Sequence, residues 1–226
     1  MKLNFQKGEI ILIDKEINWT SFDVVSKLRN SIKKKLDIKK IKVGHSGTLD
    51  PLASGLLIIC SGKMTKKIDM FSNMNKSYKG KITLGSTTPS YDLETKPNIF
   101  YPTDHVDEDL IINVAKKFEG KIFQKPPIFS AVKKDGVRLY KLARKGINVN
   151  IKEREVVISS FKINEINLPE IDFTVDCSKG TYIRSLANDF GKALGSGAHL
   201  SELRRISIGD YNVNEAQKIM DFIRSI

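Results

Sequence analysis

The sequence predicts an α/β (α+β) protein, because strand-like and helix-like segments alternate along the chain. Apolar runs with strand character recur, as at residues 8–16, and stretches with helical spacing of apolar residues lie between them, as at residues 20–35. No internal repeat and no linker-like segment interrupts this pattern. At 226 residues the chain has the length of one or two domains, and we expect a single domain with one core.

The first elements are a strand at residues 8–16 and a helix at residues 20–35. Thr20 or Ser21 can cap this helix, and Asp23, three positions after Thr20, fits a capping box. Apolar residues at helical spacing form its buried stripe: Val24, Val25, Leu28 and Ile32.

The remaining segments also alternate between strand-like and helix-like spacing of their apolar residues. Strands are predicted at residues 55–62, 77–86, 154–166 and 170–180, and helices at residues 65–74, 107–121 and 181–195. Thr181 is expected to cap the helix at 181–195. Residues 87–105 are rich in proline, threonine and aspartate, which predicts a loop. Residues 199–226 predict a turn or short helix, a short strand and a last helix.

The chain is strongly basic, with 38 lysines and arginines against 26 acids and a net charge of +12. Such an excess favours polyanions, without distinguishing RNA from DNA or from an acidic membrane. The run at residues 33–42 has two interpretations: a solvated helix end favoured by the helix dipole, or a phosphate contact beside a site. A second basic stretch, at about residues 124–150, looks like an arm with a helical turn.

Several classes of protein are not favoured. No apolar run approaches the roughly 20 residues that cross a bilayer, and the first residues lack the pattern of a signal peptide, so we expect a cytoplasmic protein without membrane contact. Cys60 and Cys177 lie in apolar runs and predict buried thiols, not a disulfide framework or a zinc site. The three histidines are scattered, and we expect no metal.

A glycine-rich loop, GHSGTLDPLASGLL at residues 44–57, presents one carboxylate, Asp50, ahead of an apolar strand. It lacks the spacing of a Walker or dinucleotide-binding loop. Pro51 biases Asp50 towards an extended conformation, while Gly47 and Gly55 permit turns that other residues resist. The pattern alone leaves three roles open for Asp50: an Asx-turn residue, a general base or a nucleophile.

Five segments together resemble the TruB-type bacterial tRNA pseudouridine-55 synthases. They are GHSGTLDPLASGLLIIC, YKGKITLG, PPIFSAVKKDGVRLYKLARKG, CSKGTYIRSLANDFG and GAHLSELRRISIG. The resemblance implies a pseudouridine-synthase fold, in which a central mixed, mostly antiparallel sheet is flanked by helices and loops. It also implies isomerisation of one uridine in the tRNA T-loop to pseudouridine, without cofactor or metal.

The resemblance assigns catalytic roles to three residues. Asp50 matches the catalytic aspartate, which attacks the flipped-out nucleotide either at the sugar C1′ or at the base. Tyr78 matches a tyrosine that stacks on the target uracil, although a half-buried strand aromatic is the alternative. Arg184 matches an arginine that pairs with the catalytic carboxylate and would keep Asp50 ionised, whereas a solvated surface arginine is the commoner fate.

Four further positions match residues around the bound RNA. Tyr182 and Leu203 match residues that line the uridine pocket, although either side chain could belong to the core. His45 matches a histidine that holds the remodelled T-loop, with a structural role as the alternative. Asp92 matches a loop acid near the site, but the surrounding TTPSYDLET departs from the family's T-D-T-x-D-x-x-G, which leaves the contacts of this loop open.

Two departures from the family pattern remain. In DKEINWTS, Glu16 and Asn18 replace a proline and a glycine, so we expect this turn to be built differently and to lie outside the chemistry. We also expect one catalytic domain over residues 1–226, without a separate C-terminal PUA-like domain. Binding of the rest of the tRNA would then depend on the catalytic domain and its basic arm at residues 124–150.

We expect a monomer that binds the T-arm of tRNA and needs no obligate protein partner. Two alternatives stay open. The first is a non-catalytic tRNA-binding or tRNA-folding protein on the same scaffold, for which Asp50 would be dispensable. The second is a synthase that acts on ribosomal RNA.

Overall fold

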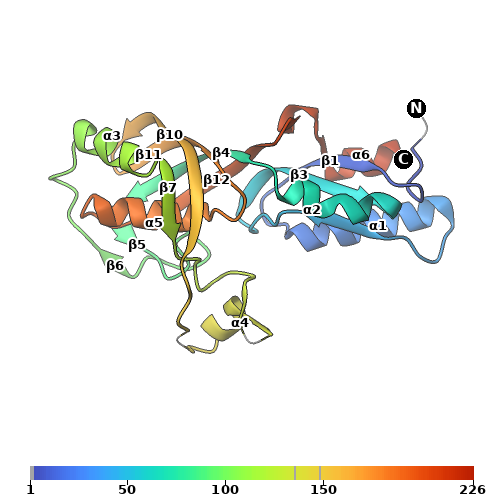
Figure 1. Cartoon of the computed structure of the whole chain (residues 1–226), viewed down its shortest axis with the longest axis horizontal. Coiled ribbons are helices and arrows are strands. Elements are labelled where there is room, and N and C mark those ends of the chain that lie inside the picture. The colour runs from blue at the N-terminus through green and yellow to red at the C-terminus, as the bar shows by residue number, and fades with distance from the viewer. Residues whose placement is uncertain (1–2, 135, 148) are drawn as a thin grey trace. The chain divides into compact units, whose positions relative to one another are not determined.

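The computed structural model describes residues 3–134, 136–147 and 149–226 and divides the chain into two compact units. Unit 1 comprises residues 1–78 and 203–226, and unit 2 comprises residues 79–202. Two strands, β4 (Lys76–Leu84) and β12 (Ala198–Ile208), contain the positions at which the chain passes from one unit to the other (Figure 1).

Unit 1 is a mixed sheet with helices packed on it. Besides parts of β4 and β12, its strands are β1 (Ile10–Lys15), β2 (Val43–Ser46), β3 (Ala53–Ser61), β13 (Tyr211–Asn212) and β14 (Gln217–Lys218). Its helices are α1 (Ser21–Leu36), η1 (Gly62–Lys67), α2 (Ile68–Ser72), η2 (Val213–Glu215) and α6 (Ile219–Ser225). One edge of β3 pairs with β1 in antiparallel orientation. The other edge pairs with β12 in parallel orientation at the start of β3, and with β2 in antiparallel orientation at its end.

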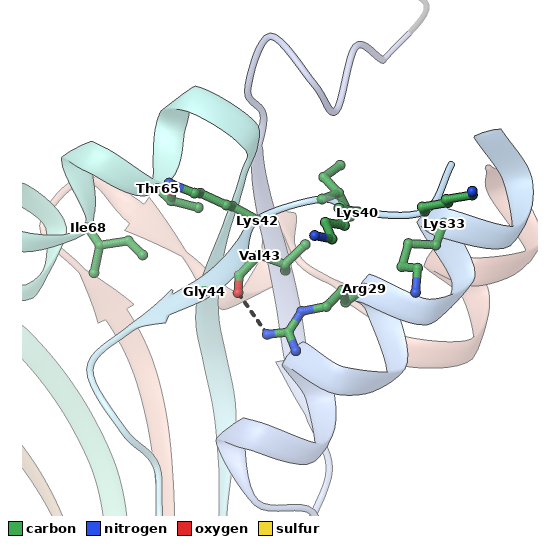
Figure 2. Close-up of a pocket in the computed structure, with 10 residues that line it drawn as sticks. Arg29, Lys33, Lys40, Lys42, Val43, Gly44, Thr65 and Ile68 are labelled. Atoms are coloured by element: carbon green, nitrogen blue, oxygen red, sulfur yellow. Dashed lines mark hydrogen bonds between the residues drawn. The ribbon is translucent and has the colours of Figure 1, made fainter. Parts of the chain in front are cut away.

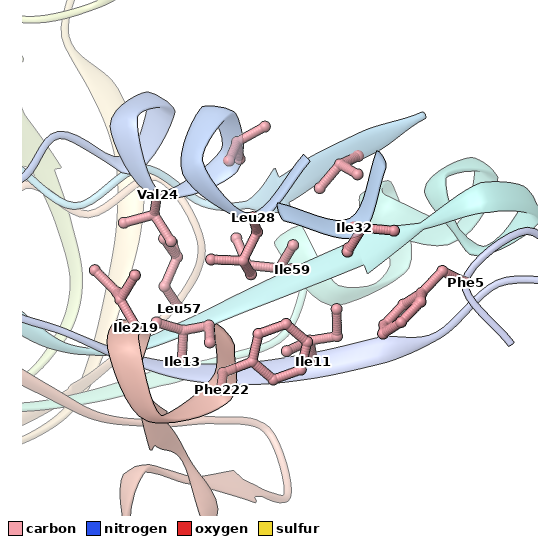
Figure 3. Packing of buried hydrophobic residues seen from close by; sticks show 12 residues of the cluster. Phe5, Ile11, Ile13, Val24, Leu28, Ile32, Leu57, Ile59, Ile219 and Phe222 are labelled. Carbon is pink, nitrogen blue, oxygen red and sulfur yellow. The ribbon is translucent and has the colours of Figure 1, made fainter. Parts of the chain in front are cut away.

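Strand β3 is buried on both faces, which explains why its sequence is a continuous apolar run. Leu57 and Ile59 point into a core with residues of β1, α1 and α6 (Figure 3). Alternate residues of β3, Leu56, Ile58 and Cys60, point into a second cluster that contains Phe71 and Ile208. The predicted strand at 55–62 is therefore confirmed, and it fixes the far end of the glycine-rich loop.

Helix α1 begins where the sequence predicts. The Thr20 side chain accepts a hydrogen bond from the Asp23 backbone N–H at 3.0 Å, and the Asp23 carboxylate accepts one from the Thr20 N–H at 2.9 Å, which completes the capping box. The predicted apolar stripe is buried. The helix ends at Asp37, whose left-handed φ of 49° turns the chain back towards β2.

Unit 2 contains a sheet in the order β4, β11, β10, β7, with β10 antiparallel to both β11 and β7. Its further elements are β5 (Ser86–Thr87), β6 (Ile99–Phe100), α3 (Glu108–Lys117), β7 (Gly120–Gln124), β8 (Lys133–Lys134), β9 (Val137–Arg138), α4 (Leu139–Ala143), β10 (Arg154–Asn167), β11 (Glu170–Cys177) and α5 (Ile183–Ala193). A cluster of edge-to-face rings joins the sheet to the helices: Phe118, Phe161, Phe173 and Phe190. The strand pairings agree with the predicted mixed, mostly antiparallel class.

Some predicted elements differ in extent. The expected helix at 65–74 is η1 followed by α2, and the expected helix at 107–121 is the shorter α3, because Gly120 with φ 92° begins β7. The basic arm contains β8, β9 and α4, but its residues 135 and 148 lie outside the described residues.

Two predictions about local structure are wrong. Thr181 does not cap α5, since its Oγ1 donates to the Ser178 carbonyl at 2.9 Å within the preceding turn, and Tyr182 is the N-cap. The turn or short helix expected after residue 199 is instead the eleven-residue strand β12. The polar side chains that argued against a strand have partners there: Ser201 donates to the Lys81 carbonyl at 3.1 Å, and Arg204 binds the Asp14 carboxylate at 2.7 and 2.9 Å.

Cys60 and Cys177 are buried thiols outside any disulfide in the described residues, as predicted, and burial raises the pKa of Cys60 to about 11. None of the helices in the described residues is both long enough and apolar enough to cross a bilayer.

Candidate active site

The glycine-rich loop of unit 1, residues 44–57, includes most of β2, the connection between β2 and β3, and the first part of β3. Gly47, with φ 78°, and Gly55, with φ 102°, adopt the left-handed conformations that the sequence predicts for them. A side chain at Gly55 would collide with the backbone of Arg205 in β12, whose nitrogen lies 2.7 Å from the Cβ position. Glycine at position 55 therefore allows the backbones of β3 and β12 to approach closely where these two strands pair.

Asp50 lies in this loop between two neighbours whose backbone groups are held in place. On one side, the Ser21 hydroxyl at the start of α1 accepts from the Leu49 N–H at 2.8 Å and donates to the Leu49 carbonyl at 3.1 Å. On the other side, the Pro51 carbonyl accepts from the Asn18 N–H at 2.8 Å. These contacts fix the backbone on both sides of the carboxylate.

The contact from Asn18 corrects an expectation about the DKEINWTS turn. Asn18 has φ 67°, the left-handed conformation that a glycine would adopt there and that asparagine tolerates better than most residues. The turn therefore has the backbone conformation available to the family's glycine, and it contacts the Asp50 loop directly.

Two buried cations from other strands support the loop. The Arg205 guanidinium is only 1% exposed, and it donates from Nε to the Leu56 carbonyl at 2.7 Å and from Nη2 to the Gly47 carbonyl at 3.1 Å. One side chain thus binds the loop on both sides of Asp50. Lys15, at the end of β1, is fully buried and donates to the Trp19 carbonyl at 2.7 Å and, at 3.5 Å, to the Pro51 carbonyl.

The electrostatics of these groups are coupled. Burial lowers the pKa of Lys15 to about 8, the Asp50 carboxylate acts in the opposite direction, and the Arg205 cation lowers it further. Burial also lowers the pKa of His45, with Arg205 adding to the effect and the Gly47 backbone opposing it. His45 is therefore a neutral imidazole at pH 7.

Unit 1 contains three further predicted site residues, two of which, His45 and Leu203, lie beside Asp50 in the strand pairings of this loop. His45 lies in β2, two residues before Gly47, and pairs across to Ile59 of β3. Leu203 is half-buried in β12 and lies opposite Ala53, whose N–H donates to the Asp50 carbonyl at 3.1 Å. Tyr78 is 8% exposed in β4, at the boundary of the unit.

Unit 2 brings together two others. Arg184, in the first turn of α5, is 3% exposed, and its Nε lies 3.5 Å from Oδ2 of the buried Asp92. Its other nitrogens donate to the carbonyls of Ser90 at 3.2 Å and Phe129 at 3.0 Å. The contacts left open for Asp92 are thus found, although the 88–95 loop departs from the family pattern. The hydroxyls of Thr88 and Ser90 hold this loop by donating to the Asp92 carbonyl.

Tyr182 is half-buried at the N-cap of α5, with the Arg154 guanidinium 5.5 Å from its ring centroid. The Gln124 side chain of β7 holds its backbone, accepting from the Tyr182 N–H at 2.7 Å and donating to its carbonyl at 3.0 Å. This arrangement fixes the position at which α5 begins, and therefore the position of Arg184 in its first turn. The ion pair expected between Asp50 and Arg184 stays a prediction, because the two residues belong to different units.

The sequence interpretation missed four positioning residues: Lys15, Ser21, Gln124 and Arg205. These residues act through partners that are distant in sequence. In the described residues, no three His, Cys, Asp or Glu side chains converge as metal ligands.

Comparison with known proteins identifies the class to which this fold and loop belong. Residues 33–183 match the family described as TruB family pseudouridylate synthase (N terminal domain), and residues 184–224 match the tRNA pseudouridylate synthase B C-terminal domain. The fold and the loop therefore define a pseudouridylate synthase.

Close relatives narrow this class. A protein of Flavobacterium johnsoniae named tRNA pseudouridine synthase B is 55% identical over 98% of this chain and 97% of its own length. A protein of the same name from Phocaeicola vulgatus is 50% identical over 97% and 94%. The chain belongs to the TruB family, which confirms the resemblance.

Solved structures agree with this assignment. A chain of a Cbf5–Nop10–Gar1 complex superposes with a TM-score of 0.71 at 32% identity, over 97% of this chain and 54% of that one. A chain of an H/ACA ribonucleoprotein bound to a substrate RNA containing 2′-deoxyuridine superposes with a TM-score of 0.69 at 31% identity, over 97% and 53%. This chain thus spans about half the length of the solved chains it matches, and the predicted pseudouridine-synthase fold is confirmed.

Proposed function

We propose that this chain converts one uridine in the T-loop of tRNA to pseudouridine, with Asp50 as the nucleophile. The membership of the TruB family and the near full-length relatives named tRNA pseudouridine synthase B support the reaction and the RNA. The choice of the T-loop uridine rests on the family resemblance of the sequence motifs.

The reaction is an isomerisation, so it needs no oxidant and no second substrate. The bond between the sugar C1′ and uracil N1 breaks, the uracil rotates, and a bond forms between C1′ and C5. The proton on C5 is lost and N1 gains one. Asp50 assists by attacking either C1′ or the base, and it is released when the new bond is complete.

The observation that carries the proposal is the fixed backbone around Asp50. Ser21, Asn18 and Lys15 hold its two neighbours, so the carboxylate approaches the substrate from a position set before binding. Preorganisation of this kind lowers the barrier because little ordering remains for the reacting groups. An Asx-turn residue in a flexible loop would not need contacts from three separate elements.

The other site residues have supporting roles in this proposal. Arg184 pairs with Asp50 and is itself oriented by Asp92. Tyr78 stacks on the flipped uracil and can assist removal of the C5 proton, because an extruded base loses stacking worth a few kcal/mol that the protein must replace. Tyr182 and Leu203 line the pocket. His45, neutral at pH 7, contacts the remodelled loop by hydrogen bonding or stacking.

The test is release of tritium from tRNA transcripts labelled at uracil C5, with wild type, Asp50→Asn and the surface control Asp104→Asn. We expect about one tritium per tRNA from wild type and from the control. Asp50→Asn should bind the same tRNA and release none, because the amide is not a nucleophile.

Three other outcomes would contradict parts of the proposal. Tight binding without release by any variant would indicate a non-catalytic tRNA-binding protein. Release by Asp50→Asn at the wild-type rate would exclude this residue as the nucleophile. Release from ribosomal RNA fragments but not from a T-arm stem-loop would place the substrate elsewhere. We further propose that the protein is a cytoplasmic monomer formed by one catalytic domain. Sedimentation with and without tRNA would check the monomeric state.

A further inference from the structure

An open groove of about 770 Å³ lies in unit 1 between the second half of α1 and the segment that leads into β2 (Figure 2). Five of the residues that line it are cations: Arg29, Lys33, Lys39, Lys40 and Lys42. Among the described residues, none with an acidic side chain or an aromatic ring lines it.

The charge of this groove is not neutralised by the protein. Among the residues that the structure describes, no carboxylate lies within 4.0 Å of any of the five cations. Arg29 donates one hydrogen bond to the Val43 carbonyl at 3.1 Å, which orients the guanidinium without changing its charge. A groove lined by one sign of charge concentrates the field and attracts polyanions.

The helix dipole explains only part of this arrangement. Lys33 lies in the last turn of α1, where a cation is favoured. Lys39, Lys40 and Lys42 come after the helix has ended at Asp37, beyond the range of that effect. The left-handed turn at Asp37 instead leads the chain back, so that the second group of lysines lines the same groove as the first. The interpretation of residues 33–42 as a solvated helix end therefore does not account for the groove.

The lining residues favour a phosphate backbone as the ligand. A site for a small nucleotide encloses most of its ligand and contacts the base, whereas this groove is open and offers no ring for stacking. Lysines spread along an open surface match the repeated charges of a nucleic acid strand, which supply most of the sequence-independent affinity.

The position of the groove indicates which part of an RNA it would bind. Gly44 lines the groove, and His45 follows it in β2. Lys42 lies three residues before His45, on the order of 10 Å along an extended strand. We infer that the groove binds the phosphates of the RNA strand that adjoins the target loop. This inference rests on the proposed function, since it takes the RNA loop to be held at His45.

The experiment compares two triple variants with the same change in charge. Lys33→Gln/Lys39→Gln/Lys40→Gln alters the groove, and Lys116→Gln/Lys117→Gln/Lys162→Gln alters exposed lysines of α3 and β10. Binding to a tRNA transcript is measured by fluorescence anisotropy between 50 and 200 mM salt. Pseudouridine formation is measured at saturating tRNA.

We expect the groove variant to bind about 10-fold more weakly and to reduce the slope of log K against log salt by about 2–3, one phosphate contact for each lysine. Its kcat should match wild type, because the groove does not touch the reacting atoms. A groove variant with the affinity and slope of the control variant would overturn the inference. The inference would also be overturned if the groove variant lost binding to anionic lipid vesicles while its tRNA binding stayed unchanged, since the partner would then be a membrane.

The failure of this inference is distinguishable from the failure of the proposed function. An active wild type with no effect of the groove variant contradicts the groove alone. A wild type that forms no pseudouridine, but whose affinity and salt slope depend on the groove lysines, contradicts the catalytic proposal and leaves RNA binding at the groove in place.

Discussion

At the scale of single residues, the main feature is that two buried cations help to organise the Asp50 loop. Lys15 and Arg205 both bind backbone carbonyls of this loop from neighbouring strands. A buried cation is costly unless its hydrogen-bonding groups are satisfied. Here the acceptors of Arg205 are carbonyls of this loop, and Lys15 binds the Pro51 carbonyl besides the carbonyls of Glu16 and Trp19. The conformation of the loop and the burial of these charges therefore depend on each other.

We predict that Arg205→Met lowers the free energy of unfolding by about 2–4 kcal/mol, because two buried carbonyls lose a charged donor. Without this contact Asp50 is less well positioned, and kcat should fall by about 100-fold with little change in KM. Denaturant unfolding and single-turnover kinetics measure the two effects. Arg205→Lys should recover part of both, since an ammonium can still bind one of the carbonyls.

The acidity of His45 gives a second prediction. Its pKa is lowered in the folded protein, so the unfolded chain binds more protons below its ordinary pKa of about 6.5. The contribution of His45 to stability is therefore complete above pH 6.5 and is lost as the pH falls towards the folded pKa. Unfolding of wild type and His45→Gln at pH 5 to 8 should show a steeper acid loss for wild type.

A titration by NMR provides the matched control. The imidazole of His45 should titrate below pH 6.5, and its midpoint should rise in Arg205→Met, because that cation lowers it. Arg204→Met removes the neighbouring guanidinium, which is bound to Asp14, and should leave the midpoint unchanged. Equal shifts in both variants would contradict the assignment to Arg205.

At the scale of elements, the turn between β1 and α1 has a direct effect on the loop. Asn18 stands where the family pattern of the resemblance has glycine, and it keeps a left-handed backbone while its N–H binds the Pro51 carbonyl. The replacement is tolerated because the left-handed conformation costs asparagine less free energy than it costs most other residues.

We predict that Asn18→Val destabilises the protein by about 1–2 kcal/mol, since a β-branched residue resists a positive φ. Asn18→Gly should stay within about 0.5 kcal/mol of wild type. The side chain of Asn18 is exposed, so neither change alters packing. Thermal or denaturant unfolding of the two variants measures the difference, and equal stabilities would show that the turn relaxes to another conformation.

Strand β12 shows where local sequence patterns are insufficient. A turn or short helix was predicted near its start, yet Ser201, Arg204 and Arg205 lie in a strand and are satisfied by side chains and carbonyls of other strands. Such partners are distant in sequence, and no local pattern identifies them. Helix α1 is the opposite case, because its cap, its stripe and its end are all encoded within about 18 residues of the chain and were predicted correctly.

At the scale of the whole molecule, the class of fold and the buried strand β3 could be predicted because their signals are local periods. The division into two units could not, because unit 1 combines residues 1–78 with residues 203–226. The same distinction applies to the site. Asp50 and Arg184 were assigned through their motifs, and their catalytic roles stay predictions. Lys15, Ser21, Gln124 and Arg205 act through contacts that only the folded chain creates.

The position of Arg205 in the chain has a consequence for biosynthesis. This arginine follows Leu56, whose carbonyl it binds, by 149 residues. A ribosome adds about 5–20 residues per second, so a nascent chain carries Asp50 for many seconds before the side chain that fixes its loop exists. Completion of the Asp50 loop is therefore a late event of synthesis, and a chain truncated before residue 205 would carry Asp50, the proposed nucleophile, without the side chain that fixes its loop.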